Sequence, residues 1–153
     1  GIRLVREKNE NIRLLVLGGS PAKSEPGIEY LGDRPYTEVL ELMKEVDVQI
    51  NASHYEGYSL SLSEGIFQAG LITLATPVGG NLNTVVHGKT GFFFQSAREL
   101  ATYLLSLSRN VELKNTLFTN IFQEMPIVSW EQVAQRTFDF AFSIPKNNEA
   151  WID

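Results

Sequence analysis

The chain has 153 residues, with 13 Lys and Arg against 18 Asp and Glu, so its formal charge at pH 7 is −5. This acidic balance, with no run of Lys or Arg, argues against nucleic-acid binding, which needs a clustered basic face. The absence of cysteine excludes disulfides, thiolate metal sites and a cysteine nucleophile, and it suits a reducing compartment. No apolar run approaches the ~20 residues of a membrane-spanning helix, and no export signal is visible. We therefore expect one globular, cytoplasmic domain.

Short apolar runs alternate with amphipathic segments along the chain. The apolar runs, which end in turn-forming residues, predict strands at residues 12–17, 28–31, 47–51, 71–75 and 90–94. Helical periodicity predicts helices at residues 36–46, 58–69, 97–108, 111–123 and 129–142. Gly70 suits a left-handed cap on the second of these helices, and Ser129 suits the N-cap of the last. Residues 81–89 are expected to form a connector.

This alternation predicts an α/β fold, namely a Rossmann-like, doubly wound parallel sheet with helices on both faces. In such a sheet the ligand binds outside the carboxyl ends of the strands, where the strand order switches. Three loops at those ends carry glycines or polar side chains, namely residues 18–20, 52–59 and 76–80. We expect these loops to converge on one site.

The most informative stretch is residues 51–64. Glu56 follows a predicted strand, and Glu64 lies about two turns into the next helix. The backbone N–H groups after Glu56 open that helix, and a helix N-terminus attracts phosphate and hydroxyl oxygens. Two carboxylates beside it can accept hydrogen bonds from the hydroxyls of a sugar or ribose. This chemistry favours an anionic, hydroxyl-rich ligand such as a nucleotide sugar.

The two acids form an E-x7-E pair, and the segment resembles the retaining glycosyltransferases of GT-B architecture (the group 1 type). Other landmarks of that family occur in order: the glycine turn after residues 12–17, Tyr30-Leu-Gly32, Gly70, Val78-Gly-Gly80, His87-Gly-Lys-Thr-Gly91 and Val128-Ser-Trp130. The resemblance implies the C-terminal, donor-binding half of a hexosyltransferase for polysaccharide biosynthesis. Such an enzyme moves a sugar from a UDP-, GDP- or ADP-sugar to a glycan, lipid or other hydroxyl and retains the anomeric configuration.

The resemblance assigns roles to individual residues. Glu56 would be catalytic, holding the donor sugar and steadying the charge that develops on it, and Glu64 would bind the ribose. The other donor-binding residues would be Gly57, Tyr58, Ser59 and Leu60 at the sugar and its distal phosphate, Gly18 and Gly19 at the nucleotide, and Gly32 and Asp33 near the base. No metal or cofactor is implied, because the family relies on a helix dipole and cationic side chains to stabilise the leaving diphosphate.

Three residues depart from the family pattern. Ser59 stands where glycine is frequent, Gly65 where alanine is usual, and Asn83 where glutamate is usual. The departures leave open a second interpretation, a non-catalytic interaction or scaffolding module with the same fold. A dinucleotide-dependent oxidoreductase is disfavoured, because no G-x-G-x-x-G follows the first strand.

The resemblance also implies parts outside the chain. Arg3 and Lys8 have the R-x4-K spacing of the family's diphosphate clamp, but only three residues separate Lys8 from the first strand, and a parallel crossover needs a dozen or more. We therefore interpret residues 1–8 as the end of a helix in a chain truncated at its start, with the clamp upstream. The acceptor-binding N-terminal domain is expected to be missing, so residues 1–153 would fold without transferring sugar. Any contact with the cytoplasmic face of a membrane is expected only through the missing part.

Three features have ordinary structural interpretations. His54 lies on a loop without a visible partner, and His87 precedes a glycine, so both are expected to be loop residues without a catalytic role. Gly79 and Gly80 are compatible with a simple turn or with a role at the site, and the sequence leaves that choice open.

Overall fold

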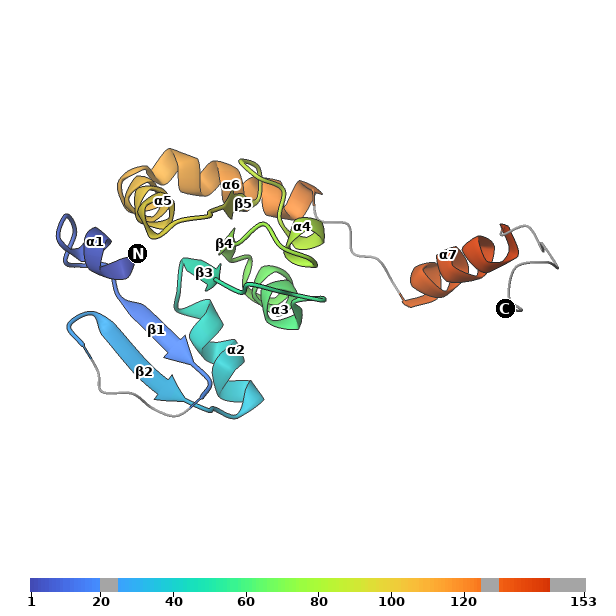
Figure 1. Cartoon of the computed structure of the whole chain (residues 1–153), viewed down its shortest axis with the longest axis horizontal. Helices are drawn as coiled ribbons and strands as arrows, with labels where there is room; N and C mark the ends of the chain where they lie inside the picture. Colours follow the sequence, from blue (N-terminus) through green and yellow to red (C-terminus); the bar gives the residue numbers. More distant parts are fainter. Residues whose placement is uncertain (20–24, 125–129, 144–153) are drawn as a thin grey trace, which may run out of the picture.

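The computed structural model describes residues 1–19, 25–124 and 130–143. Strands and helices alternate between residues 28 and 109, as the sequence predicts (Figure 1). In chain order the elements are α1 (Ile2–Arg6), β1 (Leu14–Leu17), β2 (Ile28–Gly32), α2 (Tyr36–Lys44), β3 (Val48–Asn51), α3 (Leu60–Ala69), β4 (Ile72–Ala75), α4 (Asn81–Thr84), β5 (Gly91–Phe93), α5 (Ala97–Arg109), α6 (Val111–Glu124) and α7 (Trp130–Ser143).

The strands in the described part of the chain pair only in parallel, which confirms the α/β class. β1 pairs with β2, and β4 lies between β3 and β5 in a second sheet. No ladder joins β1 to β3 in the described ranges, so these strands form two sheets instead of a single continuous one. Helices α2 and α3 lie on one side of the β3–β4–β5 sheet, and α5 and α6 lie on the other (Figure 1). The register sets Asn51 beside Ala75, so the loops that follow β3 and β4 leave the sheet together.

The core is centred on β4, whose four residues are all buried because strands flank it on both sides. Buried side chains from four helices pack with this strand, among them Val5, Ile66, Leu104, Leu117 and Ile121. Each fully buried aliphatic side chain of this size contributes about 1.5–3 kcal/mol. The carboxyl ends of β3 and β4 therefore project from the best-packed part of the domain.

Two predicted boundaries are wrong at this edge of the sheet. Helix α3 begins at Leu60 instead of Tyr58, because Ser59 is the N-cap and has an extended backbone (φ −84°, ψ 94°). Residues 81–84 form the short helix α4 where a connector was predicted, and the hydroxyl of Thr84 stabilises it by donating to the carbonyl of Gly80 at 2.9 Å. The cap at Gly70 is confirmed by its left-handed φ of 63°. Ser129 lies outside the described residues.

The first residues form helix α1, which confirms the interpretation of residues 1–8 as a helix before the first strand. Val5 is fully buried, and α1 packs against α5. Arg3 donates to Glu25 at 2.7 Å, and this hydrogen bond, together with the carboxylate charge, raises the pKa of Arg3. Because Glu25 precedes the start of β2, Arg3 lies at the opposite end of the strands from the predicted site.

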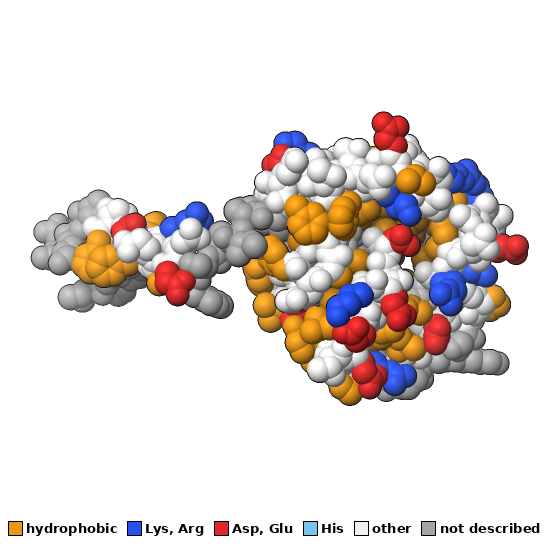
Figure 2. Space-filling model, turned by 180° about the vertical axis from the view of Figure 1, so that it is seen from behind, with side chains coloured by type: hydrophobic (Ala, Val, Ile, Leu, Met, Phe, Trp, Pro, Cys, Tyr) orange, Lys and Arg blue, Asp and Glu red, His pale blue; other side chains and the backbone are white. Residues whose placement is uncertain are grey.

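The surface carries charges of both signs. On the face in Figure 2, Lys and Arg side chains are interspersed with Asp and Glu side chains. Residues 131–143 of helix α7 are exposed. None of the described helices has the length and apolar character needed to cross a membrane.

Candidate functional site

The turn after β3 is held by hydrogen bonds to the strand that ends beside it. The backbone N–H of Thr76 donates to the carbonyl of Asn51 at 3.0 Å, and the hydroxyl of Thr76 donates to the carbonyl of Ser53 at 2.6 Å. The N–H of Ser53 donates to Oδ1 of Asn51 at 2.9 Å. The loops after β3 and β4 are thus joined, as expected from their places at the ends of neighbouring parallel strands.

Glu56 lies at the end of this turn, half-buried, with a fixed carboxylate. Its Oε2 accepts hydrogen bonds from Nδ2 of Asn51 at 3.1 Å and from the hydroxyl of Ser53 at 3.4 Å. Nδ2 of Asn51 also donates to Oγ of Ser59 at 3.2 Å, and the Ser59 residue is only 3% exposed. Asn51 therefore links the acid to the N-cap of α3.

The paired glycines Gly79 and Gly80 pack directly on the Glu56 turn. The N–H of Gly80 donates to the carbonyl of Glu56 at 2.8 Å. A Cβ at Gly79 would lie 2.9 Å from the carbonyl carbon of Glu56, and a Cβ at Gly80 would lie 2.7 Å from Cα of Tyr58. Real side chains essentially never approach that closely, so both positions need glycine. The pair supports the turn on which the acid sits.

A run of free backbone donors follows Glu56. Within the described residues, none of the N–H groups of residues 57–62 donates to a protein acceptor, and the first donor of α3 to do so is the N–H of Ser63, to the carbonyl of Ser59 at 3.1 Å. The side chain of Ser59 does not cap the helix. Free amides and the positive end of the helix dipole together make a binding place for oxygen-rich anions.

Glu64 lies further along α3, half-buried, and faces the start of α2. Partial burial, the negative charge of Glu64 and a hydrogen bond to Glu64 raise the pKa of Tyr36 above its usual value. Tyr36 is three residues after Asp33 in the chain. Glu64 therefore lies near the connection that leaves β2, where the family resemblance predicts the base of the nucleotide.

The glycines at the ends of β1 and β2 are joined to each other. The N–H of Gly18 donates to the carbonyl of Gly32 at 2.9 Å, and Gly18, Gly19 and Gly32 have φ values of 86°, 68° and 67°. Among the described residues, a Cβ at Gly18 or Gly19 would meet no atom within 4 Å. Asp33, which follows Gly32, is exposed.

The structure thus brings Glu56, Ser59 and the free amides together, and it places Glu64 beside Tyr36. Tyr58 and Leu60 are 59% and 67% exposed. Within the described residues, no hydrogen bond joins this group to the glycines after β1, which lie at the end of the other sheet.

Sequence reasoning missed three polar residues at the site, namely Asn51, Tyr36 and Asn81. Asn81 is fully buried, and its Nδ2 donates to the carbonyl of Thr76 at 3.0 Å and to Oδ1 of Asn51 at 3.5 Å. A signal was present for Asn51, since an amide at the last position of an apolar strand needs buried partners. Tyr36 and Asn81 lie on other elements, and their proximity to the acids depends on the tertiary structure.

Both histidines lie in the loop positions predicted for them. His54 is exposed, and its side chain makes no hydrogen bond within the described ranges. Nδ1 of His87 accepts from the N–H of Phe93 at 2.9 Å, and the His87 ring stacks on the Phe93 ring with centroids 5.8 Å apart. His87 therefore holds the loop before β5.

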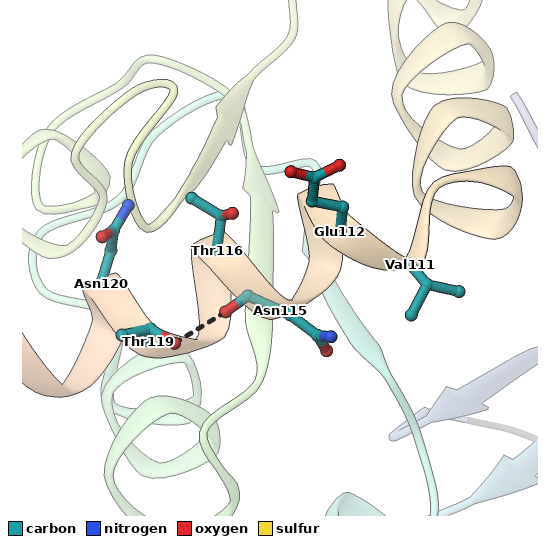
Figure 3. Close-up of a pocket in the computed structure, with 6 residues that line it drawn as sticks. All are labelled: Val111, Glu112, Asn115, Thr116, Thr119 and Asn120. Carbon is teal, nitrogen blue, oxygen red and sulfur yellow. Dashed lines mark hydrogen bonds between the residues drawn. The ribbon is translucent and has the colours of Figure 1, made fainter.

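Two surface grooves lie along α6 and along α2. One of about 510 Å³ runs along α6 (Figure 3) and is lined by Val111, Glu112, Asn115, Thr116, Thr119 and Asn120. The other, of about 460 Å³, lies between the end of β2 and α2. Neither includes Glu56 or Glu64, which stand on an open edge of the sheet. In residues 1–19, 25–124 and 130–143, no three His, Asp or Glu side chains lie close enough to hold a metal ion.

An open polar edge at the ends of parallel strands, with two acids and free helix amides, is the kind of site found in nucleotide-binding α/β proteins. The chain belongs to the glycosyl transferases group 1 family, whose sequence model matches residues 1–110. It is 30% identical over 107 residues to an uncharacterized glycosyltransferase of Methanocaldococcus jannaschii, an alignment that covers 69% of this chain and 30% of that protein. The predicted family is therefore confirmed.

Solved glycosyltransferase structures share the fold. Anabaena Alr3699/HepE, solved in complex with UDP and glucose, superposes with a TM-score of 0.71 at 18% identity, over 94% of this chain and 44% of that one. Sucrose-phosphate synthase from Thermosynechococcus elongatus gives a TM-score of 0.67 at 19% identity, over 92% of this chain and 40% of the enzyme. The chain thus spans less than half the length of these proteins, and it has the fold of GT-B glycosyltransferases.

Proposed function

We propose that this chain binds the nucleotide diphosphate sugar in a retaining glycosyltransferase. The observation that carries the proposal is the run of free N–H groups at residues 57–62, directly after a carboxylate held in place by Asn51. The amides suit the diphosphate, and the carboxylates suit the hydroxyls of the sugar and the ribose. A nucleotide sugar presents both kinds of group on one molecule.

Each proposed contact follows from the position of its residue. Glu56 stands beside the free amides and would accept from the hydroxyls of the sugar, near the carbon at which transfer occurs. Glu64 stands over the connection after β2 and would accept from the ribose. Gly18 and Gly19, which have no side chains, would let the nucleotide approach the end of β1, with the base near Gly32 and Asp33.

The proposal needs no metal, since the positive end of the α3 dipole faces the place where the leaving diphosphate gains charge. A carboxylate near the reacting carbon stabilises the positive charge that develops there in the transition state. We further propose that the acceptor, a glycan, lipid or other hydroxyl, binds outside residues 1–153. Acceptor contacts and turnover would then belong to a larger assembly than this chain.

The choice of base for a first test comes from the structural comparisons. Alr3699/HepE was also solved in complex with UDP-glucose. The likeness at 18% identity shows only a shared fold. We therefore choose UDP-glucose as the first ligand to test and compare it with GDP- and ADP-sugars.

Calorimetric titration of the chain with UDP and with UDP-glucose tests the proposal. Glu64→Ala should lower the affinity for both ligands about tenfold to a hundredfold. This is the effect of losing a hydrogen bond to a charged group, which is worth about 1.5–3 kcal/mol. Glu56→Ala should leave UDP binding nearly intact and remove the extra affinity due to glucose. Glu112→Ala on α6 removes the same charge away from the site and should change neither affinity.

The outcomes separate the two interpretations of the chain. Equal loss of UDP binding in both acid variants would refute the division of labour between Glu56 and Glu64. If neither the wild-type chain nor the variants bind any nucleotide or nucleotide sugar, the alternative of a non-catalytic interaction module with this fold is favoured.

A further inference from the structure

We propose that Asn51 is a positioning residue for Glu56, oriented in turn by the buried amide of Asn81. The inference rests on the proposed function, because it assigns Glu56 to the donor sugar. It adds a chain of three side chains, from the interior of the domain to the carboxylate, that determines which way the carboxylate points.

The amide of Asn51 is fully engaged, and its two ends have different partners. Nδ2 donates to Oε2 of Glu56 at 3.1 Å and to Oγ of Ser59 at 3.2 Å. Oδ1 accepts from the N–H of Ser53 at 2.9 Å and from Nδ2 of Asn81 at 3.5 Å. A flipped amide would set Oδ1 against the carboxylate and Nδ2 against two donors, so only one orientation fits.

Asn81 fixes that orientation from inside the domain. It is fully buried, and its Nδ2 donates to the backbone carbonyl of Thr76 at 3.0 Å as well as to Asn51. A backbone carbonyl is only an acceptor, so it dictates that Asn81 presents Nδ2 on this side. Oδ1 of Asn81 has no partner within the described residues, and a buried acceptor without a partner costs free energy.

The arrangement leaves Glu56 free to act on a ligand. Asn51 and Ser53 both contact Oε2, and Oε1 makes no hydrogen bond within the described part of the chain. Neither side chain titrates near neutral pH, and the N–H of Gly80, which precedes α4, bonds to the backbone carbonyl of Glu56. A neutral amide thus orients the acid without supplying or accepting a proton.

Replacement of this amide by a carboxylate gives a readout that a purely structural role would not give. In Asn51→Asp the new carboxylate and Glu56 stand at hydrogen-bond distance, where the two share a proton at low pH and repel each other once both are ionised at higher pH. The gain in affinity from UDP to UDP-glucose should therefore fall about tenfold at pH 8 and recover at pH 5. UDP affinity itself should stay within about threefold of wild type, because Glu56 does not touch the nucleotide.

Three further variants complete the experiment, each with its melting temperature measured. Asn51→Leu should lose the glucose-dependent gain at every pH, since no shared proton can replace the lost donor. Asn81→Ala should reduce the glucose-dependent gain in affinity while UDP binding persists. This variant also tests the link from Asn81 through Asn51 to Glu56 if changes at Asn51 prevent folding. Asn115→Asp adds the same charge on α6 and should leave the gain unchanged at both pH values.

The outcomes are distinguishable. Retention of the glucose-dependent gain by Asn51→Asp at pH 8, or an equal loss at pH 5 and pH 8, would overturn the positioning role. A gain that persists in Glu56→Ala would overturn the role assigned to Glu56, and with it this inference. Loss in Glu56→Ala with full retention in both Asn51→Leu and Asn81→Ala would overturn the inference alone.

Discussion

The side chain of Gln49 on β3 occupies the space that a Cβ on Gly65 of α3 would need. Nε2 of Gln49 donates to the carbonyl of Leu62 at 3.0 Å and to the hydroxyl of Thr73 at 2.8 Å, so its amide lies between strand and helix. A Cβ at Gly65 would stand 2.7 Å from Cδ of Gln49. Gly65, where the family usually has alanine, therefore leaves room for the long side chain of Gln49. Together these two residues determine how closely α3, which carries Glu64, packs on β3.

Gly65→Ala is expected to destabilise the domain by about 1–3 kcal/mol, the usual cost of overpacking a filled interior. The cost should shrink when Gln49→Val removes the amide, so the two changes should be strongly non-additive in a double-mutant cycle. Urea denaturation of the two single variants and the double variant measures this coupling. Gly57→Ala is the control, because a Cβ there meets nothing within 4 Å. An equal cost of Gly65→Ala with and without Gln49 would contradict the relationship.

Gly80→Ala should weaken UDP-glucose binding at least about tenfold, because the new Cβ would push the turn that carries Glu56. Gly80 has a φ of −60°, so the effect comes from the collision alone and not from backbone strain. Gly88→Ala is the control with strain but no collision, because Gly88 has a φ of +77° and a Cβ there would meet no described atom within 4 Å. It should cost about 1–2 kcal/mol of stability without changing the affinity. Calorimetry and denaturation of both variants check the contrast, and similar affinities for the two would refute it.

Tyr36 should ionise above its ordinary value of about 10, because partial burial and the neighbouring carboxylate of Glu64 raise its pKa. Since the pKa is raised in the folded state, the stabilisation is full below the unfolded pKa and is lost as the pH rises through the folded value. Tyr36→Phe should remove this part of the alkaline loss of stability. Glu64→Gln should lower the pKa of Tyr36 but not restore it fully, since the burial remains. Ultraviolet titration of the tyrosines in wild type and both variants measures the shift, and an unchanged pKa in Glu64→Gln would refute the contact.

His54→Ala should leave the affinity for UDP and UDP-glucose unchanged. The imidazole is exposed, and in the described ranges no carboxylate or hydroxyl holds it. His54 lies only two residues before Glu56, so the variant also tests whether proximity in the chain alone gives a role at the site. Loss of binding in a variant that still folds, measured by calorimetry and circular dichroism, would show that His54 has a role at the site.

The sequence predicted the features that depend on local chemistry. The spacing of Glu56 and Glu64 around a helix N-terminus was readable, as was the cap at Gly70, because helix ends and their dipoles follow local rules. Helix α4 was missed, since four residues have too little periodicity to reveal a helix that a bond from Thr84 to Gly80 supports. The late start of α3 was missed for a similar reason: Ser59 stays extended because its side chain bonds to Asn51.

The side-chain contacts at the site could not be predicted at all. Asn51 meets Asn81, thirty residues away in the chain, only because β3 and β4 are neighbours in register. Gln49 and Gly65 meet only because α3 lies on β3. Periodicity identifies which face of an element is buried, but it does not say which side chains from different elements touch.

The separation of the strands into two sheets has a consequence for hydrogen exchange. All residues of β4 are buried between two strands, whereas β1 and β2 are only partly buried and pair with each other alone in the described structure. Amide protons of β4 should exchange only on global unfolding, and those of β1 and β2 through smaller openings. In the proposed function the base lies at the ends of β1 and β2 while the sugar lies at the end of β3, so one ligand would span a slow-exchanging and a fast-exchanging unit. Ligand binding should therefore increase the protection of amide protons most in β1 and β2, although Glu56, the acid proposed to contact the sugar, lies at the end of β3.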